Sequence, residues 1–116
     1  MHHPFTIRAK LEIEKNGECF LNPKRIDLLR KIKTSGSILA ASKEMKMSYQ
    51  QAWSFVQQMN DLSPLPIVIR QRGGSHGGGA EVTRFGLNLI ERYERLEEMH
   101  LTYMQKAGEE MLFCFL

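Results

Sequence analysis

Cysteine is scarce in this chain of 116 residues, which has only Cys19 and Cys114, near opposite ends of the sequence. A disulfide framework like that of small secreted proteins is therefore not expected, and we predict that both thiols are reduced. The histidines do not have the spacing of metal ligands, either with a cysteine or with a pair of carboxylates. They are His2, His3, His76 and His100. We expect no metal site.

Long apolar runs are also missing. No segment approaches the roughly 20 apolar residues that a membrane-spanning helix needs. The first residues lack the charged and apolar regions of a signal peptide. Because 42% of the residues are hydrophobic and 25% are charged, an ordinary globular domain is indicated. We expect a cytoplasmic protein without a membrane partner.

The sequence also lacks a recognisable set of catalytic residues. Ser54 and Ser75 have no plausible His and Asp companions for nucleophilic catalysis. The glycine-rich segment 72–79 is not followed by the Gly-Lys-Ser/Thr and helix of a phosphate-binding loop, which argues against a nucleotide-binding enzyme. We predict that the protein is not an enzyme and uses no cofactor.

The charged residues that are present are unevenly distributed. The net charge is +3, but segments 22–62 and 63–86 carry +4 and +2, segment 1–21 is neutral and segment 87–116 carries −3. An excess of basic residues in the middle of the chain suits a polyanionic partner such as nucleic acid. The alternative is an ordinary solvated surface.

The N-terminal segment alternates between apolar and polar residues from Phe5 to Glu14, which predicts a half-buried strand. Asn16-Gly17 is a strong hairpin signal, and residues 18–21 are predicted to return as a second strand. A lone hairpin is marginal in water, so its apolar face is expected to rest on a helix or on another subunit.

Three helices are predicted next. Asn22 and Pro23 are typical of an N-cap and a first helical position, so a helix is predicted over 23–33, ended by Gly36. A short helix over 37–45 and a longer one over 49–62 follow, separated by residues 46–48. Ser48 and Gln51 have the spacing of a capping box. The last two helices form a predicted helix-turn-helix.

The third predicted helix turns its apolar residues inward and exposes amides and hydroxyls at its N-terminal end. Such an end suits the reading of base edges in a DNA major groove. The residues predicted to face bases are Ser48, Tyr49, Gln50, Gln51 and Ser54. For Tyr49, contact with a thymine methyl or a phosphate and packing in the capping turn remain open alternatives.

Two strands, 67–71 and 80–83, are predicted around the glycine-rich loop. Three helices followed by such a hairpin are typical of a winged helix-turn-helix, with the loop as the wing; a surface loop without a ligand is the alternative. The residues predicted to contact phosphates or the flanking groove are Ser37, Lys43, Lys46, Arg72, His76 and Arg84.

A long last helix is predicted over 84–107, capped by Thr83. Its apolar residues recur in steps of four and three, the spacing of a helix-pairing seam, so we predict a homodimer. The predicted interface residues are Leu89, Tyr93, Leu96, His100, Tyr103 and Ala107. The alternative is a helix folded back on its own hairpin. We assign no role to the apolar tail, residues 111–116.

These elements predict an α+β, mostly helical fold: a winged helix-turn-helix with an N-terminal β-hairpin and a long C-terminal dimerisation helix. Residues 1–86 form the expected DNA-binding domain. Residues 84–116 form the expected dimerisation helix and tail, and both parts belong to one structural unit.

The same residues resemble a known family, the N-terminal DNA-binding domain of the ModE molybdate-responsive regulators, a LysR-type winged helix. The resemblance covers about residues 5–105. It is carried by Arg25-x-x-Leu28-Leu29-x-x-Ile32, Gly36-Ser37-Ile38, Met47-Ser48-Tyr49-x-x-Ala52-Trp53, the glycines of the wing, and Thr83-x-x-Gly86. It implies a dimer that places one recognition helix per subunit in successive major grooves of double-stranded DNA.

The chain departs from the family pattern in two respects that matter. Family members often carry Lys or Arg after the motif tyrosine, where this chain has Gln50 and Gln51, so the operator sequence is open. The chain also has no Ser-Ala-Arg-Asn segment of an oxyanion-binding domain, so molybdate is not expected to bind it. We predict a stand-alone, sequence-specific transcriptional regulator; the alternative is a winged-helix adaptor for protein contacts.

Overall fold

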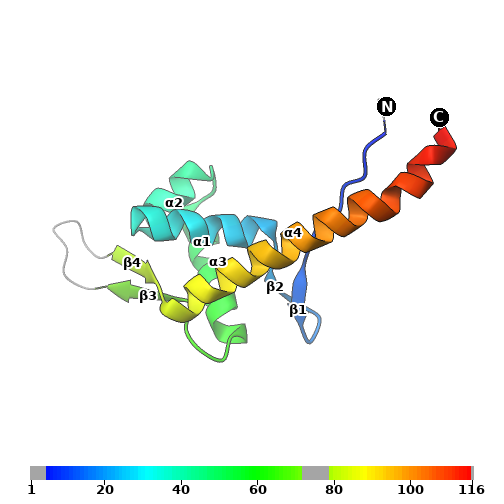
Figure 1. The fold of residues 1–116 in the computed structure, drawn as a ribbon. Coiled ribbons are helices and arrows are strands. Elements are labelled where there is room, and N and C mark those ends of the chain that lie inside the picture. The colour runs from blue at the N-terminus through cyan, green and yellow to red at the C-terminus, as the bar shows by residue number, and fades with distance from the viewer. Residues whose placement is uncertain (1–4, 72–78, 116) are drawn as a thin grey trace.

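The computed structural model describes residues 5–71 and 79–115, and Figure 1 shows the order of the elements. A short hairpin precedes three helices, a second hairpin and a long helix, which confirms the predicted winged helix-turn-helix arrangement. The strands are β1 (Ile13–Lys15), β2 (Glu18–Leu21), β3 (Val68–Gln71) and β4 (Gly79–Val82). The helices are α1 (Pro23–Ser35), α2 (Ile38–Glu44), α3 (Tyr49–Leu62) and α4 (Arg84–Leu112), followed by a 3-10 turn at Phe113–Phe115.

The ends of α1 are set by the capping residues that the sequence indicates. The Asn22 side chain accepts a hydrogen bond from Arg25 N at 2.8 Å, and Pro23 takes the first helical position. At the other end Gly36 adopts a φ of 70°, and its N–H donates to Ile32 O at 2.8 Å. The Gly36 carbonyl then accepts from Ala80 N at 2.8 Å. The turn after α1 therefore also anchors β4 of the wing.

The core lies between α1, α2, α3, the wing and the first half of α4. Ala41 of α2 and Ala52 of α3 are fully buried, and such small side chains let the two helices of the helix-turn-helix approach closely. The other fully buried side chains include Leu21, Ile26, Leu28, Leu29, Ile32, Met59 and Ile67. The first β-hairpin reaches this core through Leu21, so the hairpin rests on its own domain.

The backbone at residues 66–68 joins α3, the wing and α4. Asn60 of α3 accepts hydrogen bonds from Ile67 N and Val68 N at 2.8 and 3.2 Å and donates to Val68 O at 2.9 Å. Thr83 holds the segment from the other side, because its N–H donates to Ile67 O at 2.9 Å and its hydroxyl donates to Pro66 O at 2.7 Å. The Thr83 Oγ1 also accepts from Gly86 N and so caps α4.

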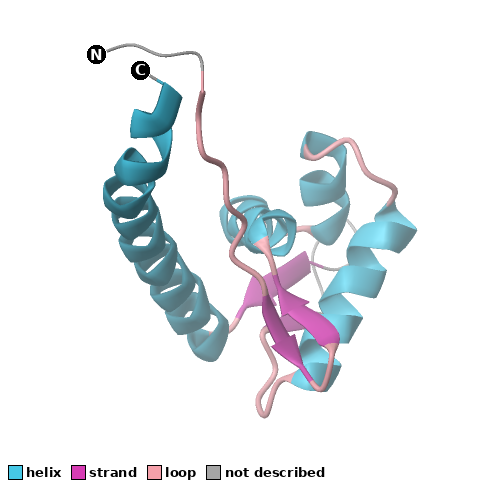
Figure 2. Ribbon diagram, turned by 90° about the vertical axis from the view of Figure 1, so that its right-hand side faces the viewer, coloured by secondary structure: helices cyan, strands magenta, loops and turns pink. Residues whose placement is uncertain are grey.

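Helix α4 leaves the domain partway along its length (Figures 1 and 2). Its 29 residues correspond to about 43 Å at about 1.5 Å per residue. The radius of gyration is 17.5 Å, whereas about 13 Å is typical of a compact chain of this length. The predicted end of this helix was near residue 107, but the helix continues to Leu112. Gly108 does not interrupt it, because the following residues are good helix formers.

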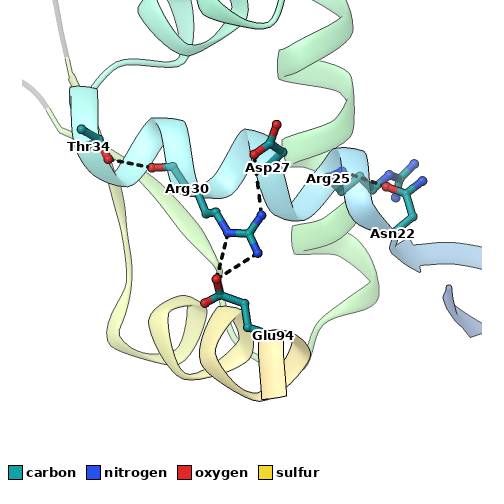
Figure 3. A network of polar contacts seen from close by, with 6 residues as sticks. All are labelled: Asn22, Arg25, Asp27, Arg30, Thr34 and Glu94. Carbon is teal, nitrogen blue, oxygen red and sulfur yellow. Dashed lines mark hydrogen bonds and ion pairs between the residues drawn. The ribbon is translucent and has the colours of Figure 1, made fainter. Parts of the chain in front are cut away.

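An ion pair links α1 to α4, as Figure 3 shows. The Arg30 guanidinium lies 2.9 Å from the Glu94 carboxylate on α4 and 3.6 Å from Asp27 on its own helix. All three side chains are more than a third exposed. The pair therefore contributes less than about 1 kcal/mol to stability.

Tyr93 corrects the predicted dimer interface. Its side chain is 2% exposed within the single chain, and its hydroxyl donates to Leu11 O at 2.7 Å. Burial and the nearby Glu97 carboxylate raise the pKa of the Tyr93 phenol, so it remains a neutral donor. Tyr93 lies at the edge of the predicted seam, beside Gly86 and Ile90 on the face that packs on the domain. It is therefore a core residue and is not available to a second subunit.

The predicted strand over residues 5–14 is also wrong for most of its length, because only Ile13–Lys15 pairs, with β2. The second strand has four residues, so residues 5–12 have no ladder partner. They run beside the C-terminal half of α4 instead (Figures 1 and 2). The Phe5 ring stacks on Phe115 at 4.2 Å between centroids, and Ile7 packs against Gly108.

Gly86 provides a test of the joint between α4 and the wing. A Cβ at this position would lie 2.6 Å from Ile67 O and 2.8 Å from Val82 Cγ1. Alanine usually stabilises a helix relative to glycine by about 0.5–1 kcal/mol. We predict instead that Gly86→Ala lowers the free energy of unfolding by about 1–3 kcal/mol in urea titrations, because backbone atoms must move.

Gly108→Ala is the matched control on the same helix. There the added methyl group would meet only the end of the Ile7 side chain, which can rotate away. We expect a change much smaller than that of Gly86→Ala. Equal losses in the two variants would contradict the close approach at Ile67.

Candidate nucleic-acid interface

The first turn of α3 presents the side chains that the sequence predicts to read bases. Ser48 is the N-cap, and its hydroxyl accepts from Gln51 N at 3.0 Å. Tyr49, Gln50 and Gln51 follow and are exposed. Ala52 and Val56 on the opposite face are buried, which fixes the rotation of the helix. The two glutamine amides are therefore directed to solvent from a helix end that is rigidly packed.

Ser54 lies one turn further along the same helix. It is exposed, and its hydroxyl accepts from the Gln58 amide at 3.2 Å. Gln58 in turn accepts from Arg25, which is 6% exposed and stacks on Phe55 at 4.9 Å. Ser54 therefore belongs to a network that ties α3 to α1, and it is less free to contact bases than the first-turn residues.

The turn between α2 and α3 adds basic side chains next to this helix end. Lys43 is in the last turn of α2 and Lys46 is in the connection, and both are exposed. Lys46 has a φ of 54°, a left-handed conformation that is unusual for a residue other than glycine. Ser37 is the half-buried N-cap of α2 and accepts from Ala40 N at 3.1 Å. Its hydroxyl is thus engaged in capping.

Arg70 on β3 was missed by the sequence interpretation. Its guanidinium donates to the Tyr49 hydroxyl at 2.9 Å and lies 3.9 Å from the centroid of the Trp53 ring. Tyr49 and Trp53 are four residues apart, so both rise from one face of α3. The only sequence signal was an arginine in the predicted wing strand, and nothing local related it to Tyr49, which is 21 positions away.

The remaining predicted contacts are distributed around the hairpin of the wing. Arg84 is exposed at the first position of α4, at the end of the hairpin away from the glycine-rich loop. Arg72 and His76 lie outside the described residues. The structure therefore places Arg70 against the first turns of α3, and it places Arg84 at the base of the wing. Lys43 and Lys46 lie shortly before this helix end in the chain.

Among the residues that the structure describes, no carboxylate forms an ion pair with the basic side chains of this surface. Within the described ranges, the ion pairs involve Arg30 with Asp27 and Glu94, and none involves Lys43, Lys46 or Arg70. Uncompensated cations beside exposed amides favour an anionic ligand. The helix end is thus suited both to attract a phosphate backbone and to read base edges.

The free half of α4 carries the remaining predicted interface. At about 100° per residue, Leu96, His100, Tyr103 and Ala107 project within about 60° of one another. Leu96 is 45% exposed and Tyr103 is 69% exposed. Leu89, on the same side, is half-buried against the core. The exposed part of the seam therefore begins beyond the domain, from Leu96 onward.

Other kinds of site receive little support from the described part of the chain. No group of three or more His, Cys, Asp or Glu side chains there is placed to hold a metal ion. None of its helices is long and apolar enough to cross a membrane. An open cleft of about 540 Å³ lies at the C-terminal half of α3, lined by Arg25, Gln58, Asp61 and residues of β2. Its lining mixes both signs of charge, which defines no particular ligand.

Solved structures identify the class of fold. A LysR family transcriptional regulator of known crystal structure superposes with a TM-score of 0.54 over 75% of this chain and 28% of that chain, at 14% sequence identity. The likeness shows that the chain has the LysR-type winged-helix fold. No family model matches the sequence.

Curated relatives narrow the class further. The Transcriptional regulator ModE of Haemophilus influenzae is 40% identical over 87 residues, which are 75% of this chain and 34% of that protein. The DNA-binding transcriptional dual regulator ModE of Escherichia coli K12 is 40% identical over 89 residues, 77% of this chain and 34% of that protein. The chain is a ModE homologue and matches the N-terminal DNA-binding domain of these regulators. It spans about a third of the length of the curated relatives it matches.

Two substitutions of Ser48 can separate its role as the N-cap of α3 from the effect of this position on DNA binding. We predict that Ser48→Ala lowers the free energy of unfolding by about 1 kcal/mol, because the cap is lost. Ser48→Asp should retain the stability, since aspartate is an equally good N-cap. It should nevertheless weaken binding to duplex DNA, because it adds a negative charge beside the glutamine amides.

Urea unfolding and fluorescence anisotropy with labelled duplex DNA measure the two effects on the same preparations. If Ser48→Asp bound DNA as tightly as the wild type, the first turn of α3 would not face the duplex.

Proposed function

We propose that this chain is the DNA-binding part of a sequence-specific transcriptional regulator that acts in the cytoplasm as a dimer. The observation that supports this most strongly is the exposed first turn of α3 with its two glutamine amides, preceded in the chain by the exposed Lys43 and Lys46. Arg70 is hydrogen-bonded to Tyr49 of the same turn. This turn occurs on a domain that matches the DNA-binding domain of ModE. No effector is assigned to the chain, and molybdate is not among its proposed ligands.

The chemistry of the first turn suits direct readout. A glutamine amide can donate to and accept from one adenine edge in the major groove, through N7 and the N6 amino group. Gln50 and Gln51 are the proposed base-reading residues. Ser48 and Ser37 keep their helix ends in place through their caps, and Lys43 and Lys46 contact phosphates, which set the register of the protein on the duplex.

The wing and the start of α4 extend the contact beyond the major groove. Arg84 at the base of the hairpin is the proposed phosphate contact there. Arg72 and His76, which lie outside the described residues, are proposed as phosphate contacts from the sequence alone. Phosphate contacts of this kind raise affinity for every sequence, while the glutamines provide the discrimination.

Dimerisation is proposed through the free half of α4. Residues 5–12 run beside this half of the helix, but Leu96, Met99 and Tyr103 remain exposed on it, and exposed apolar side chains of this kind favour pairing. A twofold pairing of such helices buries this face against its copy. In this arrangement each subunit presents one α3, and the two helices would read half-sites about one helical turn apart, roughly 34–36 Å.

A selection on random duplex DNA tests the reading function. We predict that the wild-type protein enriches a sequence with two related half-sites, and that its affinity falls steeply as salt is raised. Replacement of both glutamines, Gln50→Ala with Gln51→Ala, should cost about 1–3 kcal/mol of discrimination for each lost bidentate pair. The same variant should keep most of its affinity for unrelated duplexes.

Two results would speak against this assignment. An unchanged sequence preference in the glutamine variant would remove Gln50 and Gln51 from the base contacts. An affinity for duplex DNA that does not respond to salt would favour the alternative function, an adaptor that uses the winged-helix surface for protein contacts.

Charge substitutions on α4 test the dimer. We predict that Leu96→Glu and Tyr103→Glu raise the dimer dissociation constant more than tenfold, or about 1.4 kcal/mol, because each places two carboxylates in one twofold interface. Analytical ultracentrifugation measures the constant. Leu101→Glu is the matched control, since Leu101 is 49% exposed but projects about 140° away from Leu96. Equal effects of Leu101→Glu and Leu96→Glu would argue against this face.

A further inference from the structure

We propose that Arg70 is a DNA-contacting residue that binds a backbone phosphate and, at the same time, positions the reading end of α3 against the wing. The inference rests on the proposed function and adds to it a residue and a role. It is carried by the juxtaposition of Arg70 on β3 with Tyr49 and Trp53 on α3.

The surroundings of the guanidinium leave its charge available. Both of its partners, the Tyr49 phenol and the Trp53 indole ring, are neutral groups. Among the described residues no carboxylate forms an ion pair with it. Arginine has five N–H donors in a planar fork, of which the phenol takes one. The remaining donors can bind phosphate oxygens in the bidentate geometry for which arginine is suited.

Tyr49 takes part in the same proposed phosphate contact. Its oxygen accepts a hydrogen bond from Arg70, so its own hydrogen must be donated to another acceptor. The side chain is 40% exposed at the first position of α3, where the predicted alternatives were a DNA contact and packing in the capping turn. The hydrogen bond from Arg70 favours the first of these, a contact with the duplex backbone, in which Arg70 orients the phenol so that its O–H points toward a phosphate.

Trp53 supplies the support for this arrangement. A guanidinium stacked at 3.9 Å on an indole ring is held by cation–π attraction and loses little freedom when it binds a further ligand. Because Arg70 lies on β3 and its two partners lie on α3, the stack also bridges the wing and α3 at the surface. A phosphate bound here would lie between the two DNA-contacting elements.

The salt dependence of DNA binding distinguishes a phosphate contact from a purely structural role. For wild-type protein and variants, the affinity for the selected duplex is measured by anisotropy from low to high salt. We expect Arg70→Gln to weaken binding about tenfold and to reduce the slope of log K against log salt by about 0.9, the value for one phosphate. Arg70→Lys should keep the slope, since the charge remains, but should bind more weakly than the wild type.

Two further variants distinguish the loss of the Arg70 contact from the loss of a hydroxyl or of net charge. Tyr49→Phe should weaken binding without a change in slope, because it removes a hydroxyl and no charge. Arg8→Gln is the matched control: it removes the same charge from an exposed position in the N-terminal segment, which runs beside the far half of α4. Its slope should remain that of the wild type. Urea unfolding of each variant reports any loss of fold.

The outcomes separate the inference from the proposed function. If the wild type binds DNA and Arg70→Gln keeps its salt slope, Arg70 makes no phosphate contact and the inference is overturned. An equal loss of slope in Arg8→Gln would overturn it as well, since the effect would then be one of net charge. If the wild-type protein binds no duplex at all, the proposed function itself fails.

Discussion

The geometry of the molecule depends on the backbone of residues 66–68, which is held from two sides. Asn60 of α3 satisfies the N–H groups of Ile67 and Val68 and the carbonyl of Val68, while Thr83 binds the carbonyls of Pro66 and Ile67. Gly86 closes the joint, since a side chain there would collide with Ile67 O. One short segment therefore fixes α3, the wing and the first turn of α4 relative to one another. Because Ile67 and Val68 are buried, the loss of the Asn60 or Thr83 partner would leave their backbone groups unsatisfied, which makes the joint specific.

The position of Arg70 follows from that joint. Val68 pairs with Val82, and Arg70 lies two residues further along β3, opposite Ala80. Ala80 in turn donates to Gly36 O, so the wing is also attached to the turn before α2. With its strands fixed at both of these points, the hairpin brings the Arg70 guanidinium over Trp53 and against Tyr49 without any contact between neighbours in sequence. The arrangement of charge at the candidate interface is thus a consequence of backbone hydrogen bonds elsewhere in the domain.

Features that depend on neighbouring residues could be predicted from the sequence, and those that depend on distant ones could not. The caps at Asn22, Ser48 and Thr83 and the turn at Gly36 are local, and the structure has helix ends at each of them. The alternation of residues 5–14 was misleading, because apolar contacts with α4 produce the same pattern as pairing in a sheet. Tyr93 fits the spacing of a helix seam, but that spacing does not reveal which part of a long helix lies against its own domain. For the same reason Arg70 could not be related to Tyr49, whose proximity exists only in the folded chain.

The basic and acidic residues are distributed asymmetrically between the two parts of the chain. Segment 22–86 is basic, while segment 87–116 carries a net charge of −3 from a series of glutamates along α4. In the proposed complex with DNA, the phosphates that attract the helix-turn-helix and the wing would repel the glutamate-bearing helix over about a Debye length, roughly 10 Å at 0.1 M salt. This repulsion disfavours orientations in which α4 lies along the duplex, and it favours those in which α3 meets the groove and α4 points away from the DNA. The Arg30–Glu94 pair lies where the two zones meet and joins them across α1 and α4. The same acidic helix that could pair with its copy therefore also helps to select the face that a duplex can approach.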